Sequence, residues 1–169
     1  KSFWSKEPTI HLLPHWNMEG YPSPVKVWAY TNCEEAELFL NGKSLGKIKT
    51  GRFNHGEWFV PFTKGELKVV GYIGGKAVVS DKKVTSKKGT ALKLEVMNPE
   101  DLTAKDGTVI LYRVTVVDED GLLDETAEAT ISVSCSNVGT VIGTGSDIAD
   151  HVPMKETVRK MRAGKMTVG

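Results

Sequence analysis

The pattern of hydrophobic and polar residues along the chain predicts short β-strands throughout. Residues 25–30 alternate apolar and polar side chains as far as Ala29, and residues 91–97 alternate cleanly. Because successive side chains of a strand point to opposite faces, this alternation indicates strands with one buried face. Residues 109–117 form the longest apolar-rich strand. The other predicted strands cover residues 37–40, 44–48, 57–61, 66–72, 76–79, 84–85, 129–134, 140–142 and 165–168.

Two dipeptides mark hairpin turns between these strands. Asn41-Gly42 separates residues 37–40 from 44–48, and Asn-Gly readily takes the two positive-φ positions of a type I′ turn. Gly74-Gly75, after Ile73, separates residues 66–72 from 76–79 and predicts a second hairpin.

The order of the elements indicates two domains. Strands of this length, with turn signals about every 8–12 residues, are typical of sandwiches rather than α/β units. The polar residues 86–89 separate two such blocks, and 169 residues suit two domains of about 80 residues. We predict an all-β fold with two consecutive immunoglobulin-like β-sandwich domains, residues 19–87 and 88–169. Residues 165–168 would begin a last strand that the chain end cuts short.

A single stretch has helical spacing. Met154, Val158 and Met161 lie at positions i, i+4 and i+7, with Pro153 before them and Gly164 after them. This pattern predicts a two-turn helix with a glycine stop, and an irregular loop is the alternative.

Composition excludes several classes of partner. The 22 Lys and Arg residues nearly balance 21 Asp and Glu, and no basic stripe stands out, which argues against nucleic acid. No apolar run approaches the roughly 18 residues of a membrane span. No signal-peptide pattern is visible. Because the chain begins with Lys1 rather than Met, we expect it to be a piece of a longer protein.

The cysteines do not decide the compartment. Cys33 and Cys135 fall in different predicted domains, so we interpret both as buried free thiols. A disulfide between them is the alternative.

Three acidic residues deserve consideration as cation ligands. Asp118, Asp120 and Asp124 lie around Gly121, with a spacing that resembles part of a calcium loop. The register of a full loop is not met. The favoured interpretation is a tight turn between two strands in which Gly121 supplies a positive φ. We therefore predict no metal and no cofactor, with these three residues as weak metal candidates.

The tryptophans are candidates for contact with sugar, because flat apolar sugar faces suit large aromatic rings. Trp28 and Trp58 lie in predicted strands, so we expect both to pack in a core. Trp4 and Trp16 lie outside the predicted domains, together with His15. His11 and His15 have an i, i+4 spacing, but Pro14 between them argues against a helical metal pair.

Several strings carry a resemblance to a known family. Residues 11–17 (HLLPHWN), 30–46 (YTNCEEAELFLNGKSLG), 58–62 (WFVPF) and 65–72 (GELKVVGY) resemble the domain after the catalytic barrel in bacterial family 2 glycoside hydrolases of the β-galactosidase type. The second block resembles the next domain of these enzymes mostly in pattern, and residues 143–147 are similar to a G-x-G-N-G-D run found there.

This resemblance implies a supporting role. The nucleophile and acid/base glutamates of the family belong to the barrel, so no catalytic residue is expected here. Residues 1–18 would form an extended linker leading from the missing barrel, and Trp4, His15 and Trp16 would contact that barrel or a sugar. We therefore expect Trp4 and Trp16 to be more exposed or more mobile than Trp58.

The leading hypothesis is a non-catalytic C-terminal accessory region of a β-galactosidase-like enzyme, active in the periplasm or outside the cell. Its partner would be the catalytic barrel of the same chain. The first alternative is a carbohydrate-binding module, which predicts a row of exposed aromatic residues on one sheet face or loop rim. The second alternative is an adhesive or spacer array of immunoglobulin-like domains. The fragment itself is expected to have no enzymatic activity.

Overall fold

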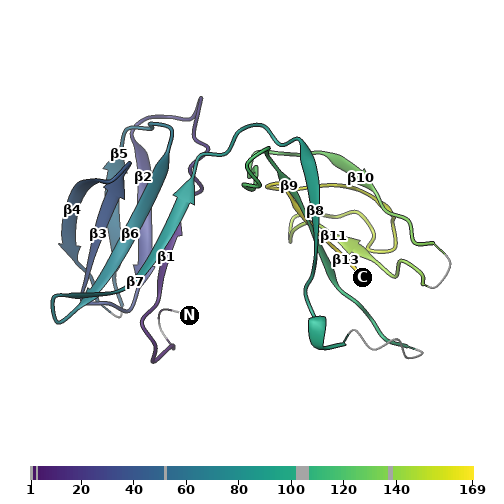
Figure 1. The fold of residues 1–169 in the computed structure, drawn as a ribbon, viewed down its shortest axis with the longest axis horizontal. Helices are drawn as coiled ribbons and strands as arrows, with labels where there is room; N and C mark the ends of the chain where they lie inside the picture. Colours follow the sequence, from purple (N-terminus) through teal and green to yellow (C-terminus); the bar gives the residue numbers. More distant parts are fainter. Residues whose placement is uncertain (1, 3, 52, 102–106, 137–138) are drawn as a thin grey trace. The chain divides into compact units, whose positions relative to one another are not determined.

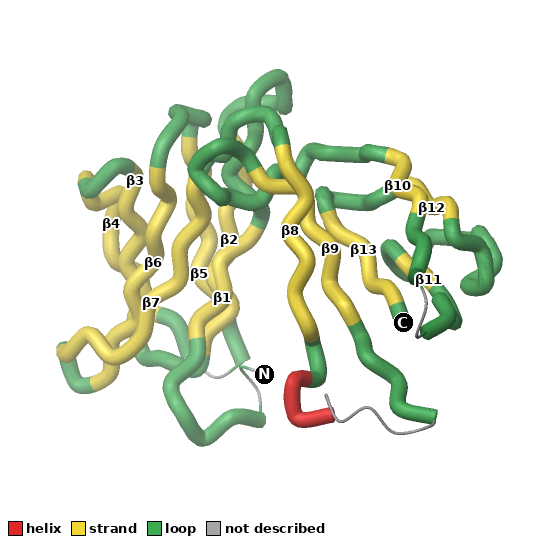
Figure 2. The backbone as a smooth tube through the Cα atoms, turned by 45° about the vertical axis from the view of Figure 1, so that its right-hand side comes forward, coloured by secondary structure: helices red, strands yellow, loops and turns green. Residues whose placement is uncertain are grey.

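A computed structural model describes residues 2, 4–51, 53–101, 107–136 and 139–169. These residues form two compact units, Lys1–Thr85 and Ser86–Gly169 (Figure 1). Antiparallel sheets dominate both units, so the prediction of an all-β fold with β-sandwich domains is confirmed. The one helical element in the described part is a 3₁₀ turn, Pro99–Asp101 (Figure 2). None of the helical structure described is long and apolar enough to cross a bilayer.

The first unit has two sheets. One sheet has the strand order β1-β2-β5 and the other β4-β3-β6-β7. The strands of the first sheet are β1 (Ile10–Leu13), β2 (Val25–Thr31) and β5 (His55–Val60). Those of the second are β3 (Glu35–Leu40), β4 (Lys43–Lys49), β6 (Glu66–Ile73) and β7 (Lys76–Val84).

The core of the first unit contains the apolar half of each alternating strand. Every second residue of β2 is buried, as are Leu38 of β3 and Val69 of β6. Trp16 is fully buried in the same cluster, where its ring meets Phe62 edge-on at 5.4 Å between centroids. Its Nε1 donates a hydrogen bond to the carbonyl oxygen of Thr63 at 2.9 Å, so the buried indole keeps no unsatisfied donor.

The structure corrects the role expected for residues 10–18. We predicted that residues 1–18 form a linker, but β1 pairs along its length with β2. Leu12 and Trp16 are fully buried in the core of the first unit, and Met18 is buried with them. The segment around Pro14 therefore belongs to the sandwich, because its apolar side chains find their cover there.

The Asn41-Gly42 turn forms as predicted. Asn41 has φ of 50° and Gly42 has φ of 79°, both in the left-handed region that a type I′ turn needs. The Asn41 side chain also accepts a hydrogen bond from the Glu66 amide at 2.8 Å and donates one to the Lys64 carbonyl at 3.0 Å. The turn between β3 and β4 is thus fixed to the start of β6.

The second unit also has two sheets. The larger has the order β11-β13-β9-β8 and the smaller is the pair β10-β12. The larger sheet contains β8 (Ala91–Val96), β9 (Tyr112–Val117), β11 (Thr144–Gly145) and β13 (Lys165–Val168). The smaller contains β10 (Thr130–Ser132) and β12 (Val158–Lys160). The buried core consists of Val114, Val116, Met161, Met166 and Val168.

The helix predicted after Pro153 is wrong. Residues 158–160 form β12, whose neighbour Met161 donates its N–H to the Ala129 carbonyl at 2.8 Å. Only Met161 of the three spaced apolar residues is buried, whereas Met154 and Val158 are exposed. The apolar spacing therefore did not mark a single buried face, and pairing with β10 decided the conformation. Residues 140–142 are likewise not a strand; β11 lies two residues further on.

Replacing Trp16 with alanine tests its place in the core. We expect Trp16→Ala to lower the free energy of unfolding of the first unit by about 3–5 kcal/mol, because it leaves a large cavity. Trp4→Ala is the matched control: Trp4 is 82% exposed, so its loss should change stability by about 0.5 kcal/mol or less. Urea unfolding followed by circular dichroism measures both. Equal effects of the two substitutions would contradict this account of the core.

Candidate functional site

The outer face of the β1-β2-β5 sheet gathers aromatic and charged side chains. Strand register places Trp28 opposite Glu57, Tyr30 opposite His55, and Lys26 opposite Phe59. Because residues opposite one another share a face, all six point away from the buried half of β2. We call these residues the aromatic face: Lys26, Trp28, Tyr30, His55, Glu57 and Phe59.

Glu57 organises the aromatic face. Its carboxylate accepts a hydrogen bond from Trp28 Nε1 at 2.9 Å, and Lys26 Nζ lies 3.0 Å from the same oxygen. His55 Nε2 lies 3.8 Å from it. The hydrogen bond from Trp28, followed by that from Lys26, lowers the pKa of Glu57. The carboxylate is therefore ionised at neutral pH and holds three side chains of two strands in fixed positions.

The rings of the aromatic face contact one another as well as Lys26. The Trp28 and His55 rings meet edge-on at 6.5 Å, and the Tyr30 and His55 centroids are 5.5 Å apart. Lys26 Nζ lies 5.2 Å from the Trp28 ring centre and 5.6 Å from that of Phe59. Phe59 nevertheless remains 62% exposed and Tyr30 is also exposed. The result is an ordered aromatic surface in contact with solvent.

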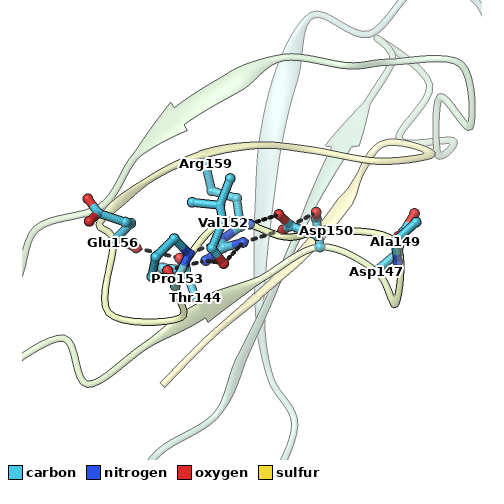
Figure 3. A network of polar contacts seen from close by, with 9 residues as sticks. Thr144, Asp147, Ala149, Asp150, Val152, Pro153, Glu156 and Arg159 are labelled. Atoms are coloured by element: carbon cyan, nitrogen blue, oxygen red, sulfur yellow. Dashed lines mark hydrogen bonds and ion pairs between the residues drawn. The ribbon is translucent and has the colours of Figure 1, made fainter.

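A second ordered feature lies in the other unit, around the buried guanidinium of Arg159 (Figure 3). Its Nε donates to Thr144 Oγ1 at 2.7 Å, and one terminal nitrogen contacts the Asp150 carboxylate. The other terminal nitrogen donates to the carbonyls of Pro153 at 2.8 Å and Val152 at 3.2 Å. One side chain on β12 therefore fixes β11 and the loop between the two strands.

Asp150 completes this network. It accepts hydrogen bonds from Ser146 Oγ at 2.7 Å and from the Val152 amide at 3.1 Å, besides its contact with Arg159. The hydrogen bond from Ser146, followed by that from Arg159, holds the pKa of Asp150 far below its usual range. A buried pair of this kind is stable only when its remaining hydrogen bonds are also made. We therefore interpret the network as a support for the loop.

The Asp118 carboxylate in the acidic turn of the second unit binds backbone amides. Asp118 accepts hydrogen bonds from three amides: Lys87 at 2.8 Å, Leu122 at 2.8 Å and Asp120 at 3.0 Å. Burial acts to raise the pKa of Asp118, but these N–H groups outweigh it and lower the pKa. Gly121 has φ of 77° and donates to the Asp118 carbonyl, so the predicted turn is confirmed.

The Asp124 carboxylate also accepts hydrogen bonds, from the Gly89 amide at 2.9 Å and from the Thr126 hydroxyl. The Asp120 carboxylate lies 2.9 Å from Lys87 Nζ. Over the described ranges, no three His, Cys, Asp or Glu side chains gather as a metal site requires. The structure does not bring Asp118, Asp120 and Asp124 together as a ligand set.

The three residues expected to contact sugar or the barrel, Trp4, His15 and Trp16, differ in how far they are exposed. Trp4 is far more exposed than Trp58, as predicted, but the prediction that Trp16 is also exposed is wrong. His15 is half-buried; its Nδ1 accepts a hydrogen bond from the Asn17 amide at 3.2 Å, and its ring lies edge-on to Tyr21. Trp16 and His15 therefore take part in the local packing of the first unit.

Two further expectations need correction. Trp28, predicted to be a core residue, lies half-buried on the aromatic face, because the buried positions of β2 are those of the odd-numbered residues Val25, Val27 and Ala29. The cysteines are both free, but only Cys33 is buried, whereas Cys135 is exposed.

The six carboxyl groups whose pKa is shifted do not have the shift that a glycosidase general acid needs. A general acid needs a raised pKa so that it keeps its proton at neutral pH. The resolved shifts of carboxyl groups all lower the pKa, and they belong to Glu37, Glu57, Asp118, Asp124, Glu128 and Asp150. Each of these carboxylates accepts hydrogen bonds that favour its ionised form.

The chain is similar to a small part of much longer enzymes. The family described as "Domain of unknown function (DUF4982)" matches residues 23–79. A β-galactosidase of Bacteroides ovatus is 32% identical over 173 residues, which cover 99% of this chain and 20% of that protein. A β-glucuronidase of Formosa agariphila is 30% identical over 124 residues, which cover 72% of this chain and 12% of the relative.

Solved structures give the same result. The chain is similar to part of a β-glycosidase from Bacteroides vulgatus, with a TM-score of 0.89 and 28% identity over 99% of this chain and 22% of that one. A glycosyl hydrolase family 2 member from Bacteroides cellulosilyticus matches with a TM-score of 0.85 and 28% identity, over 98% and 25% of the two chains. The chain thus spans about a fifth to a quarter of these structures.

Removing the Asp150 charge should destabilise the second unit in a pH-dependent manner. The pKa of Asp150 is lowered in the folded state, so its contribution is present above the unfolded pKa of about 3.9. That contribution is lost as pH falls towards the folded pKa. We expect Asp150→Asn to unfold at a lower temperature than the wild type at pH 7, and the difference to shrink below about pH 4.

Asp147→Asn provides a control in the same loop. The Asp147 side chain accepts a hydrogen bond from the Ala149 amide, which an asparagine oxygen can also accept. This variant should unfold close to the wild type across the pH range. Thermal unfolding between pH 3 and 7, flanking the unfolded pKa of about 3.9, gives both comparisons. A constant difference between Asp150→Asn and wild type would refute the ionised role of Asp150.

Proposed function

We propose that this chain, which is homologous over its length to a non-catalytic accessory region of glycoside hydrolase family 2 enzymes, supports the catalytic domain of such an enzyme. The observation that carries the proposal is the aromatic face of the first unit. It is an exposed, ordered surface on a chain that spans only a fifth of its full-length Bacteroides relative.

The composition of the aromatic face suits a protein partner. Aromatic residues are enriched at the centres of protein interfaces, where they bury large areas at little entropic cost. Here Trp28 and His55 are already oriented by Glu57, so little side-chain freedom remains to be lost on binding. We infer that Tyr30 and Phe59, the exposed rings, make the central contacts with the catalytic domain.

The activity of the whole enzyme follows from its relatives only as a proposal. The relatives are named β-galactosidase, β-glucuronidase and β-glycosidase, and all come from bacteria. We propose a bacterial enzyme that hydrolyses β-galactosides or a related β-glycoside in the periplasm or outside the cell. The catalytic carboxylates would belong to the catalytic domain, because this chain spans only 20% of the Bacteroides ovatus β-galactosidase.

A second candidate function, carbohydrate binding, is favoured by one observation. The aromatic face places the exposed rings of Tyr30 and Phe59 on one sheet face with the half-buried ring of Trp28, and the carbohydrate-binding hypothesis predicts exposed aromatic residues in such a position. It ranks second because Lys26 lies over both the Trp28 and Phe59 rings, where a sugar would stack. Titration with galactose, lactose and glucuronic acid, followed by tryptophan fluorescence, tests it. A saturable change at millimolar sugar that Phe59→Ser abolishes would favour this function instead.

Paired substitutions in the aromatic face test the docking role. In the full-length enzyme we expect Tyr30→Ser and Phe59→Ser each to lower the thermal inactivation temperature by about 4–8 °C, the shift that about 1 kcal/mol produces in a domain the size of the first unit, Lys1–Thr85. The isolated 169-residue chain should show little change, because both side chains are exposed there. Leu45→Ser, an exposed residue of β4 in the other sheet, is the control and should alter neither.

Two results would contradict the proposed function. One is an equal loss of stability in the isolated chain and in the full-length enzyme, which would show that the aromatic face only stabilises its own unit. The other is steady hydrolysis of a chromogenic β-galactoside or β-glucuronide by the purified 169-residue chain.

A further inference from the structure

The inner face of β8 is apolar but lies open to solvent. Leu92 and Leu94 of β8 lie opposite Val116 and Val114 of β9, so these four residues share one face of the sheet. Both valines are buried in the core, whereas Leu92 is 53% exposed and Leu94 is 62% exposed. The same apolar surface is therefore covered over β9 and uncovered over β8.

The exposed leucines do not belong to the solvent face of the sheet. The alternate residues of β8, Lys93 and Glu95, point the other way and form an ion pair at 2.7 Å. The strand thus has the usual division into a polar face and an apolar face. What differs is that the apolar face lacks a covering layer at this edge.

The narrow second sheet explains the lack of cover. It contains only β10 and β12 in the described part, opposite a sheet of four strands. Arg159 on β12 reaches Thr144 on β11, so β12 lies at the β11 side of the larger sheet. Figure 2 shows β10 and β12 on this side and β8 at the opposite edge. A strand next to β10, on the side away from β12, would therefore lie nearer to β8 and its open leucines.

The edge of β10 at that position can accept a strand. Val133 donates its N–H to Thr157, and the Ala129 carbonyl accepts from Met161, so residues 129 and 133 bond towards β12. In an antiparallel strand the intervening residues, Thr130 and Ser132, direct their N–H and C=O groups to the other edge. Within the described ranges no strand pairs there. Exposed strand edges of this kind bind a further strand readily.

We propose that a further β-strand pairs with the free edge of β10 and covers Leu92 and Leu94, and that it comes from a part of the same enzyme chain outside these 169 residues. The strand would carry apolar residues at alternate positions, facing β8. A partner in the same polypeptide is favoured because the chain spans only 20–22% of the Bacteroides ovatus and Bacteroides vulgatus relatives. Tethering also gives such a strand a high effective concentration.

Cysteine labelling tests this cover directly. In a Cys135→Ser background, Leu94→Cys should react rapidly with a water-soluble maleimide in the 169-residue chain. In the full-length enzyme the same cysteine should react at least about tenfold more slowly, since strand pairing buries it. Lys93→Cys, one residue away on the polar face, is the matched control and should react equally in both proteins. Leu92→Cys repeats the test if Leu94→Cys fails to fold.

Hydrogen exchange identifies what covers the leucines. Pairing of a strand with β10 should slow exchange of the Thr130 and Ser132 amides in the full-length enzyme relative to the 169-residue chain. Equal maleimide labelling in both proteins would overturn the proposal, as would protection of Leu94→Cys without protection of these amides. Concentration-dependent protection in the 169-residue chain alone would assign the surface to a second copy instead.

The proposal rests on the proposed function only in requiring a longer enzyme chain. The two can fail separately, because Tyr30 and Phe59 lie in the first unit and the labelled residues lie in the second.

Discussion

Each sheet of this chain buries one face, and that constraint determines where the rest of the structure can interact. In the first unit the buried half of β2 packs with Trp16, Leu38 and Val69, so its other half must face outwards. Three of those outward positions carry Lys26, Trp28 and Tyr30 rather than small polar residues. The aromatic face is therefore a consequence of strand alternation together with an unusual choice of exposed side chains.

The same constraint distinguishes the roles of charged groups in the two units. Glu57 lies at the surface, where it orients the aromatic side chain of Trp28 and the amine of Lys26. Arg159 is buried and the Asp150 side chain is largely buried against it, so their polar atoms need partners, and the pair fixes a loop between β11 and β12. In both places the charge maintains geometry, which agrees with an accessory region whose carboxylates do not take part in hydrolysis.

Much of the fold could be predicted from the sequence, because alternation and turn chemistry are local signals. The Asn41-Gly42 turn and the Gly121 turn formed as expected. β12 was missed because its pairing with β10 is a long-range contact that no local pattern reports. The aromatic face was missed although the alternation of β2 contained it. Trp28 was expected in the core because it lies in a strand, whereas the even-numbered residues of β2 face outwards. The burial of Trp16 depends on Phe62 and Thr63, distant in sequence.

Hydroxyl-radical footprinting tests most directly whether the aromatic face contacts the catalytic domain. Oxidation of Tyr30 and Phe59 would be compared between the 169-residue chain and the full-length enzyme, with the exposed Tyr21 as an internal reference. We predict that both rings are oxidised in the isolated chain and protected in the enzyme, while Tyr21 reacts alike in both. Equal oxidation of Tyr30 and Phe59 in the two proteins would contradict the account.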